Sequence, residues 1–407
     1  MSRTTRTTLS LAGAVVLMAV TACSSSSSSN DKAGGKSAIV IGNVGSYSGA
    51  QASSEASARQ VIEAWAKWVN GHGGVRGRQV KLIVKDDQND PARALSAVKE
   101  LVQQDKAVAI VGEQSNGDAA WAKYASQAGI PVVGGLAINT PFLTNPDFFP
   151  SGTNALALTY ALLQNAKAKG GPFAFLYCTE SPLCAQSVPL YQGLAKAVGV
   201  SILVMMKVSG TAPDYTAQCE ALKQAHVTSF QVGSAAAVAF NVAKACRAQG
   251  VSAPLLASGG SVTQAWAKDP AVDGTVSAES NFPFTDSSVA ATKEYQAAKA
   301  KYAPAVGDGE GEVAAGAWAA GKLFEAAVAA APAGAITGAS VKQGLYALKN
   351  ETLGGLVPPL NFTKGKPALI NCYFNIEVTG GKVTAPQGLK TSCAPDAVIS
   401  AIASHIG

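Results

Sequence analysis

The sequence predicts an α/β protein with two doubly wound lobes, each built on a parallel sheet. Short, continuously apolar segments of strand length alternate with longer segments whose apolar residues have helical spacing. This alternation runs to Val133 and restarts at Phe173, so we expect two lobes. The 407 residues suffice for two or three domains, and an apolar content of 48% supports packed cores.

The first run contains apolar strands, one alternating strand and three helices. Val80, Leu82 and Val84 alternate with lysines, which predicts a strand near the sheet edge. Asp90 and Pro91 predict a helix N-cap and a first helical residue. The expected strands are residues 39–41, 80–84, 108–112 and 130–133; the expected helices are 58–69, 91–102 and 119–128; and residues 42–49 are expected to form a glycine-rich loop.

The second run repeats the pattern and then changes character. After its last helices comes an alternating segment that turns at Gly380 and Gly381, which predicts a β-hairpin. The expected strands are residues 173–177, 202–206, 230–232 and 255–257; the expected helices are 188–198, 215–224, 238–248, 289–302, 313–331 and 341–349; and the hairpin is 369–385.

The N-terminus predicts export. Arg3 and Arg6 precede an apolar stretch over residues 9–20 that is too short to span a membrane. Val20-Thr21-Ala22-Cys23 resembles the bacterial lipobox, which predicts a signal peptide of residues 1–22 and a lipid on Cys23. A plain secretory signal with an incidental cysteine is the alternative. The serine-rich run that follows predicts a tether over residues 23–37, so we expect an extracytoplasmic protein anchored to the cell membrane.

Six further cysteines lie in the exported part, where an oxidising environment permits disulfides. Six cysteines allow 15 connectivities. Proximity in sequence favours Cys178–Cys184, Cys219–Cys246 and Cys372–Cys393, and free buried thiols are the alternative. There is no Cys-x-x-Cys, which disfavours a zinc site and thioredoxin-like redox chemistry.

The motifs that carry catalysis are missing. The three histidines are far apart, no Gly-x-Ser-x-Gly occurs, and the glycines at Gly42 and Gly45 do not have dinucleotide-binding spacing. We therefore expect no enzyme activity, no cofactor and no metal. Asp86, Asp87 and Asp90 are expected to be solvated strand-end and cap residues rather than cation ligands. A net charge of +6 without a basic stripe argues against a nucleic-acid partner.

An ordered set of motifs resembles a known family. The set comprises AWAKWVNGHGGVRG at residues 64–77, RQVKL at 78–82, DDQNDP at 86–91, LVQQDK at 101–106 and GIPV at 129–132. It is similar to the type I periplasmic binding proteins of the leucine/isoleucine/valine-binding group, which are receptors of ABC importers. The resemblance implies that fold: two flavodoxin-like lobes joined by a three-segment hinge, with crossings near residues 152, 284 and 355.

The lobes implied by this resemblance are residues 38–151 plus 285–354 and residues 152–284 plus 355–407. Ligand would sit between them at the carboxyl ends of the strands, where open α/β sheets bind ligands, and the hinge would close over it. The loop 113–117 would bind a ligand carboxylate through hydroxyl and N–H groups. The implied ligand-binding residues are Tyr47, Ser48, Gln51, Gln114, Ser115, Asn116, Ala137, Ile138, Asn139, Glu180, Ser181, Leu183, Ser234 and Gly259.

Two departures from the family bear on the ligand. Leucine-type binders hold the ligand ammonium with an acidic residue near the loop that here is Ser258-Gly259-Gly260, and an aromatic expected near Ala235 is missing. We expect Glu180 or Glu113 to take an ammonium group instead. The site loops contain no lysine or arginine, which disfavours a phosphate-rich ligand.

The expected function is a lipid-anchored receptor that binds a small amino acid, amide or organic acid and works with ABC permease and ATPase subunits. A sensor of the same fold that signals ligand occupancy to a membrane or regulatory partner is the second hypothesis. An extracytoplasmic α/β enzyme is the third, because a fold does not by itself determine function.

Overall fold

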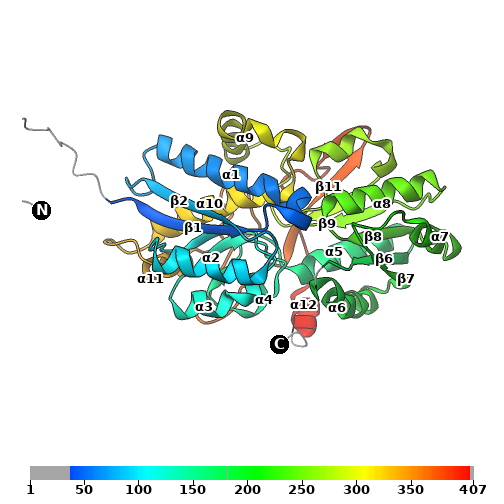
Figure 1. Ribbon diagram of the computed structural model, residues 1–407, viewed down its shortest axis with the longest axis horizontal. Coiled ribbons are helices and arrows are strands. Elements are labelled where there is room, and N and C mark those ends of the chain that lie inside the picture. Colours follow the sequence, from blue (N-terminus) through cyan, green and yellow to red (C-terminus); the bar gives the residue numbers. More distant parts are fainter. Residues whose placement is uncertain (1–36, 181, 404–407) are drawn as a thin grey trace, which may run out of the picture. The chain divides into compact units, whose positions relative to one another are not determined.

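The computed structural model describes residues 37–403 except Ser181, and the elements named below all lie within them. The first sheet is parallel throughout, with strand order β2-β1-β3-β4-β5 (Figure 1). Its edge strand β2 is the one whose apolar residues alternate with lysines, as predicted. The strands are β1 (Ile39–Gly45), β2 (Val80–Asp86), β3 (Ile110–Glu113), β4 (Val132–Gly135) and β5 (Phe148–Phe149).

The second sheet has strand order β12-β11-β10-β9-β8-β6-β7, and β13 pairs with β11. Neighbouring strands from β10 to β7 are parallel, whereas β11 runs antiparallel to β10 and forms the predicted hairpin with β12. The strands are β6 (Pro172–Cys178), β7 (Ser201–Val208), β8 (Ser229–Gly233), β9 (Leu255–Ser258), β10 (Val276–Glu279), β11 (Cys372–Thr379), β12 (Lys382–Thr384) and β13 (Ser392–Cys393).

Helices cover both sheets. Those packed around the first sheet are α1 (Ala52–Gly71), α2 (Pro91–Gln103), α3 (Ala122–Gln127), α4 (Thr140–Thr144), α9 (Ala290–Tyr302), α10 (Glu312–Ala330) and α11 (Gly338–Ala347). Those packed around the second are α5 (Ala155–Ala168), α6 (Pro182–Val198), α7 (Thr216–Gln224), α8 (Ala236–Ala248) and α12 (Asp396–Ala403). Short 3-10 helices lie at Gly49–Gln51, Asp118–Ala120, Gln264–Lys268, Pro270–Val272 and Pro304–Gly309.

The chain passes between the two lobes three times, through segments 150–154, 280–289 and 348–371, which confirms the predicted three-segment hinge. Buried hydrogen bonds join these segments to one another. The Asn281 side-chain amide donates to the carbonyl of Ser151 at 2.6 Å, and the Phe282 N–H donates to the carbonyl of Leu356 at 3.0 Å. The lobe boundaries given in the sequence analysis stay a prediction.

Several elements differ from the expectations. Residues 42–45 belong to β1 rather than to a loop, because Gly42 and Gly45 pair in register with Ile83 and Asp86 of β2. The periodicity did not predict β5, β10, β13, α4, α5 or α12. The strand β10 reads Val-Ser-Ala-Glu, and its two buried polar residues conceal a central strand.

The helix α10 forms the core of the first lobe. Within the described residues it is the one helix long and apolar enough to cross a membrane, yet 72% of that stretch is buried inside the protein. Trp65 of α1 is fully buried against it and makes an edge-to-face contact with Phe324 of α10.

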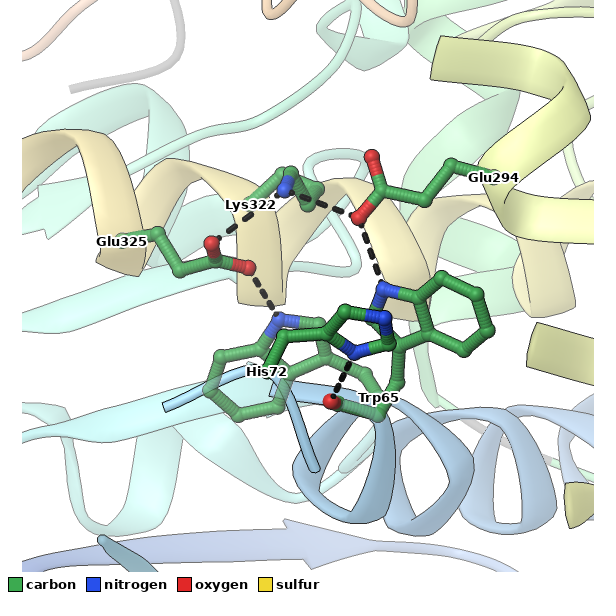
Figure 2. A network of polar contacts seen from close by, with 6 residues as sticks. Trp65, His72, Glu294, Lys322 and Glu325 are labelled. Carbon is green, nitrogen blue, oxygen red and sulfur yellow. Dashed lines mark hydrogen bonds and ion pairs between the residues drawn. The ribbon is translucent and has the colours of Figure 1, made fainter. Parts of the chain in front are cut away.

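The partly buried Trp68 also lies at this contact. Figure 2 shows how Lys322 of α10 bridges Glu325, which accepts from the Trp65 indole at 2.8 Å, and Glu294 of α9. Glu294 accepts from the Trp68 indole at 2.9 Å.

The six described cysteines pair as sequence proximity favours: Cys178–Cys184, Cys219–Cys246 and Cys372–Cys393. The first links the end of β6 to α6, the second joins α7 to α8, and the third joins β11 to β13. All three therefore lie in the lobe of the second sheet. The predicted signal peptide, tether and lipidated Cys23 lie outside the described residues, apart from Ser37.

We predict that Gly321→Ala destabilises the first lobe. A Cβ at Gly321 would lie 2.3 Å from the Trp65 ring, so the contact between α1 and α10 must shift. Overpacking of this kind costs about 1–3 kcal/mol of unfolding free energy, measurable by urea denaturation. Gly193→Ala in α6 is the control, because its Cβ would meet only Ile402 at 3.4 Å and alanine favours helix. Equal stability of the two variants would contradict the packing described here.

Candidate ligand site between the lobes

The two lobes touch where helix α1 meets helix α8. The N-cap residue of α8, Ala235, has no side chain that could cap the helix. Its first N–H groups instead donate across the interface: Ala236 N–H to the Ser54 hydroxyl at 3.0 Å, and Ala237 N–H to the Ser53 hydroxyl at 3.4 Å. Serines of one lobe thus satisfy the helix end of the other, which stabilises this contact between the lobes.

The loop after β1 is held by two aspartates. The Tyr47 N–H donates to Asp86 at 3.1 Å, and the Ser46 hydroxyl donates to Asp87 at 2.7 Å. Asp87 is fully buried, so the expectation of a solvated residue is wrong for it. The Tyr47 hydroxyl donates to Asn43 at 2.6 Å, and burial raises its pKa well above the usual value. Ser48 and Gln51 are half-buried beside this loop.

The loop 113–117, which was predicted to bind a ligand carboxylate, uses its hydrogen-bond donors within the protein. The Ser115 hydroxyl donates to Asp87 at 2.5 Å, and the Ser115 N–H donates to Glu113 at 2.8 Å. The N–H groups of Asn116 and Gly117 donate at 3.2 Å to the hydroxyls of Ser46 and Ser115, respectively. A ligand carboxylate would have to displace these bonds. Gln114 Oε1 and Asn116 Nδ2 have no hydrogen-bond partner, so these side chains remain candidates for ligand contact.

The loop after β4 packs against the same network. Asn139 is buried and donates through its side-chain amide to the Ser115 carbonyl at 3.0 Å. Ala137 is also buried, whereas Ile138 is 40% exposed. The structure therefore brings together the first-lobe residues named from the sequence, but their polar groups mainly form hydrogen bonds within the protein. Ligand contact by these residues stays a prediction.

The two carboxylates expected to take a ligand ammonium have other partners. Glu113 accepts from the N–H groups of Ser115 and Leu136, and burial raises its pKa well above the usual value. Glu180 accepts from the Ser209 hydroxyl at 2.9 Å and from the Gly210 N–H at 2.7 Å. Partial burial raises the pKa of Glu180, but these hydrogen bonds outweigh it and lower the pKa overall.

The other second-lobe candidates lie on separate loops. Ser234 is half-buried just before α8, next to the contact with α1. Gly259 follows β9, and a Cβ there would lie 3.4 Å from a carboxylate oxygen of Glu312. Leu183 lies in the first turn of α6, and Ser181 lies outside the described residues.

Three buried glutamates at this interface were not identified from the sequence. Glu55 lies in the first turn of α1, Glu312 begins α10, and Glu279 ends β10. The Glu312 carboxylate accepts from the Ser280 N–H at 3.1 Å and from Gly260 in the loop after β9. The loop that lacks its own acidic residue therefore receives one from another element. The sequence around Glu55 and Glu312 does not indicate their burial, because a charged residue in a helix ordinarily lies on the exposed face.

The comparisons with known proteins agree with this architecture. The family model described as periplasmic binding protein matches residues 38–382. The chain belongs to this family. It is a family of extracytoplasmic solute-binding proteins rather than enzymes, whose members in ABC transport bind a small molecule and interact with permease components.

A curated relative, an amino acid binding protein of Pseudomonas aeruginosa, is 31% identical over 123 residues, which is 29% of this chain. The match spans 30% of that relative's length. A solved branched-chain amino acid ABC transporter protein of Thermus thermophilus with bound valine shares the fold with a TM-score of 0.81, 19% identity and coverage of 92% of this chain and 100% of that one.

A fatty acid ABC transporter substrate-binding protein of Thermomonospora curvata is similar with a TM-score of 0.75 and 20% identity. The match covers 89% of this chain and 94% of that one. Proteins of this fold are thus named for ligands as different as valine and a fatty acid, so the fold does not by itself determine the ligand here.

We predict that Ser115→Ala lowers the stability of the ligand-free protein. The change removes a hydrogen bond to the buried Asp87 carboxylate, and such a loss costs about 1–3 kcal/mol of unfolding free energy, measurable by thermal and urea denaturation. Ser96→Ala is the control, because Ser96 is exposed on α2. An unchanged stability for Ser115→Ala would show that the hydroxyl is free for ligand, as the sequence alone suggests.

Proposed function

We propose that this protein is a lipid-anchored solute-binding receptor that delivers a small amino acid, amide or organic acid to an ABC importer. The observation that carries the proposal is the pair of lobes joined by three crossing segments, in a chain of the periplasmic binding protein family. The amino acid named for the Pseudomonas relative and the valine of the Thermus structure support an amino acid as ligand; the fatty acid neighbour supports an organic acid.

In this proposal, ligand binding closes the two lobes and so completes a surface that a permease can recognise. Ligand enters between the open lobes and contacts the strand-end loops of both. Rotation about the three crossing segments then brings α1 to α8, where Ser53 and Ser54 take up the N–H groups of the α8 terminus. Ligand binding favours the closed form because only that form contacts it from both sides. The permease would recognise the face that closure completes.

We predict that the bound ligand stabilises the protein and closes it. A thermal-shift screen of amino acids, amides and aliphatic or aromatic acids should give at least one hit, since ligand at a hundred times its Kd adds about 2.7 kcal/mol. That ligand should also reduce the radius of gyration in X-ray scattering.

Ser54→Ala should weaken binding about fivefold through loss of one interlobe hydrogen bond, with Ser96→Ala as the unchanged control. A protein that folds but responds to no compound in the screen would refute the receptor proposal.

We predict that Cys23→Ser releases the protein from the membrane. Lipid on this cysteine would anchor the exported chain, and serine cannot carry a thioether-linked lipid. Cell fractionation should find the wild type in the membrane fraction and the variant in the soluble extracytoplasmic fraction. Retention of the variant in the membrane would refute the anchor while leaving ligand binding untouched.

A further inference from the structure

A cavity lies in the first lobe, away from the strand-end loops. Its volume is about 430 Å³, and small-molecule sites typically have volumes of about 300–1,000 Å³. Three parts of the chain line it: the turn after α1, one face of α10 and the third crossing segment. The charged lining residues are Arg76, Lys322, Glu325 and Glu351. The cavity therefore combines both signs of charge with room for a small solute.

Helix α10 forms one wall of the cavity along its length. Its lining positions are Lys322, Glu325, Ala326 and Ala329, which are spaced by three or four residues and so share one face of the helix. Seven helical residues rise by about 10 Å. The two ends of this wall can therefore have different chemical surroundings.

The end of the wall near Ala329 is positively charged. Arg76 donates through Nη1 to the carbonyls of Val328 at 3.3 Å, Ala331 at 3.4 Å and Pro332 at 3.1 Å. These hydrogen bonds hold the guanidinium at the C-terminal end of α10. A guanidinium has five N–H donors in a planar fork, so it can hold helix carbonyls and bind a carboxylate as well.

The other end of the wall is rich in carboxylates. Lys322 Nζ lies 3.3 Å from a carboxylate oxygen of Glu294 and 3.2 Å from one of Glu325, as Figure 2 shows. One ammonium thus serves two carboxylates. Glu325 also accepts from the Trp65 indole at 2.8 Å, which fixes its position.

A further carboxylate, that of Glu351, comes from the crossing segment. Glu351 takes part in none of the ion pairs among the described residues. Its carboxylate accepts from the Leu353 N–H at 2.7 Å and so stays close to its own segment. That segment lies toward the acidic end, because a Cβ at Gly354 would lie 3.1 Å from Ala291, which precedes Glu294 by about one turn of α9.

The backbone at the cavity is specialised on both sides. Arg76 and Leu353 each have a φ of 51°, which residues other than glycine rarely adopt. A Cβ at Gly74 would lie 2.0 Å from the carbonyl oxygen of Arg78, so the turn that presents Arg76 requires glycine. Strained positions persist where the surrounding structure enforces them, and they cluster at ligand sites.

We propose that this cavity is a second solute site, which takes a zwitterion whose amine and carboxylate lie at opposite ends of a short apolar chain. The carboxylate binds the guanidinium of Arg76, and the ammonium binds Glu351 beside Glu325. The apolar chain lies along Ala329 and Leu353. This goes beyond the proposed receptor function, because the site lies outside the cleft between the lobes.

Other solutes fit the cavity less well. An α-amino acid carries both charges on one carbon, so it cannot reach both ends of a wall about 10 Å long. A simple amine gains nothing from Arg76, and a simple carboxylate gains nothing from Glu351. The described part of the chain contains no group of three acidic, histidine or cysteine side chains arranged to hold a metal ion.

The test uses zwitterions of increasing length. Calorimetry on the purified protein would compare 4-aminobutyrate, 5-aminopentanoate and 6-aminohexanoate with butylamine and pentanoate, which each carry one of the two charges. At least one zwitterion should bind tenfold or more tightly than either single-charge compound, since it gains one further charged hydrogen bond. It should also shift the methyl NMR signals of Ala329 and Leu353, which line the cavity, rather than that of Ala137 in the cleft.

Two pairs of variants locate the site. Ala329→Trp should fill the cavity and abolish this binding, whereas Ala330→Trp, at the next position, should not; both alanines are exposed, so neither change overpacks the core. Glu351→Gln keeps an acceptor for the Leu353 N–H and should weaken binding about tenfold through loss of charge. Glu63→Gln, whose side chain is 38% exposed on α1, is its control. Circular dichroism checks folding, and the exposed tryptophan pair decides the test if Glu351→Gln does not fold.

The results that overturn the second site differ from those that overturn the receptor. If no zwitterion binds, if Ala329→Trp binds it as the wild type does, or if only the methyl signal of Ala137 shifts, the second site is refuted and the receptor function stands. If a zwitterion binds in the cavity but no compound of the wider screen binds in the cleft, the receptor proposal fails and the second site stands.

Discussion

The region between the lobes depends on one physical constraint: buried carboxyl groups that take part in none of the ion pairs among the described residues. Glu55, Glu279 and Glu312 come from a helix, a strand and a second helix, and folding removes all three from water. Each must either accept a proton or obtain a positive partner, because an isolated buried charge is too costly. Burial accordingly raises the pKa of each of the three groups.

The position of Glu312 couples this constraint to the hinge. Its carboxylate accepts from Ser280, one residue before Asn281, whose amide ties the second crossing segment to Ser151 of the first. The Glu312 carboxylate therefore lies directly beside the segments that cross between the lobes. The sheets themselves need not deform, since their strands pair only within each lobe. In the proposed receptor, buried polar groups at the crossing segments, rather than the cores, would link binding to closure.

Much of the fold could be predicted because local patterns determine it. Continuous apolar runs such as Phe173–Tyr177 identify central parallel strands, and Asp90 caps α2 with its side chain as expected. The strand β10 escaped prediction because its partners β9 and β11 are distant in sequence and its Ser277 and Glu279 are polar. Sequence proximity sufficed for the disulfides, since each closes a loop between neighbouring elements.

The site was less predictable, because local patterns do not determine which side chains meet in the folded protein. Loops at strand ends could be located, but the partners of their side chains could not. Ser115 and Asn139 have hydroxyl and amide groups suited to a ligand, yet their hydrogen bonds go to Asp87 and to a neighbouring carbonyl. Glu55 follows two serines at the start of a helix and resembles a solvated residue. Its burial depends on elements distant in sequence that pack against α1, such as α10.

The most direct measurement is an NMR titration of isotope-labelled glutamate side-chain carboxyls, with assignment through Glu55→Gln and Glu312→Gln. At pH 7 the carboxyl of Glu55 should be mainly protonated, because burial and the neighbouring carboxylates raise its pKa to about 8. A Glu55 carboxyl that is already ionised at pH 7 would contradict its burial beside other carboxylates.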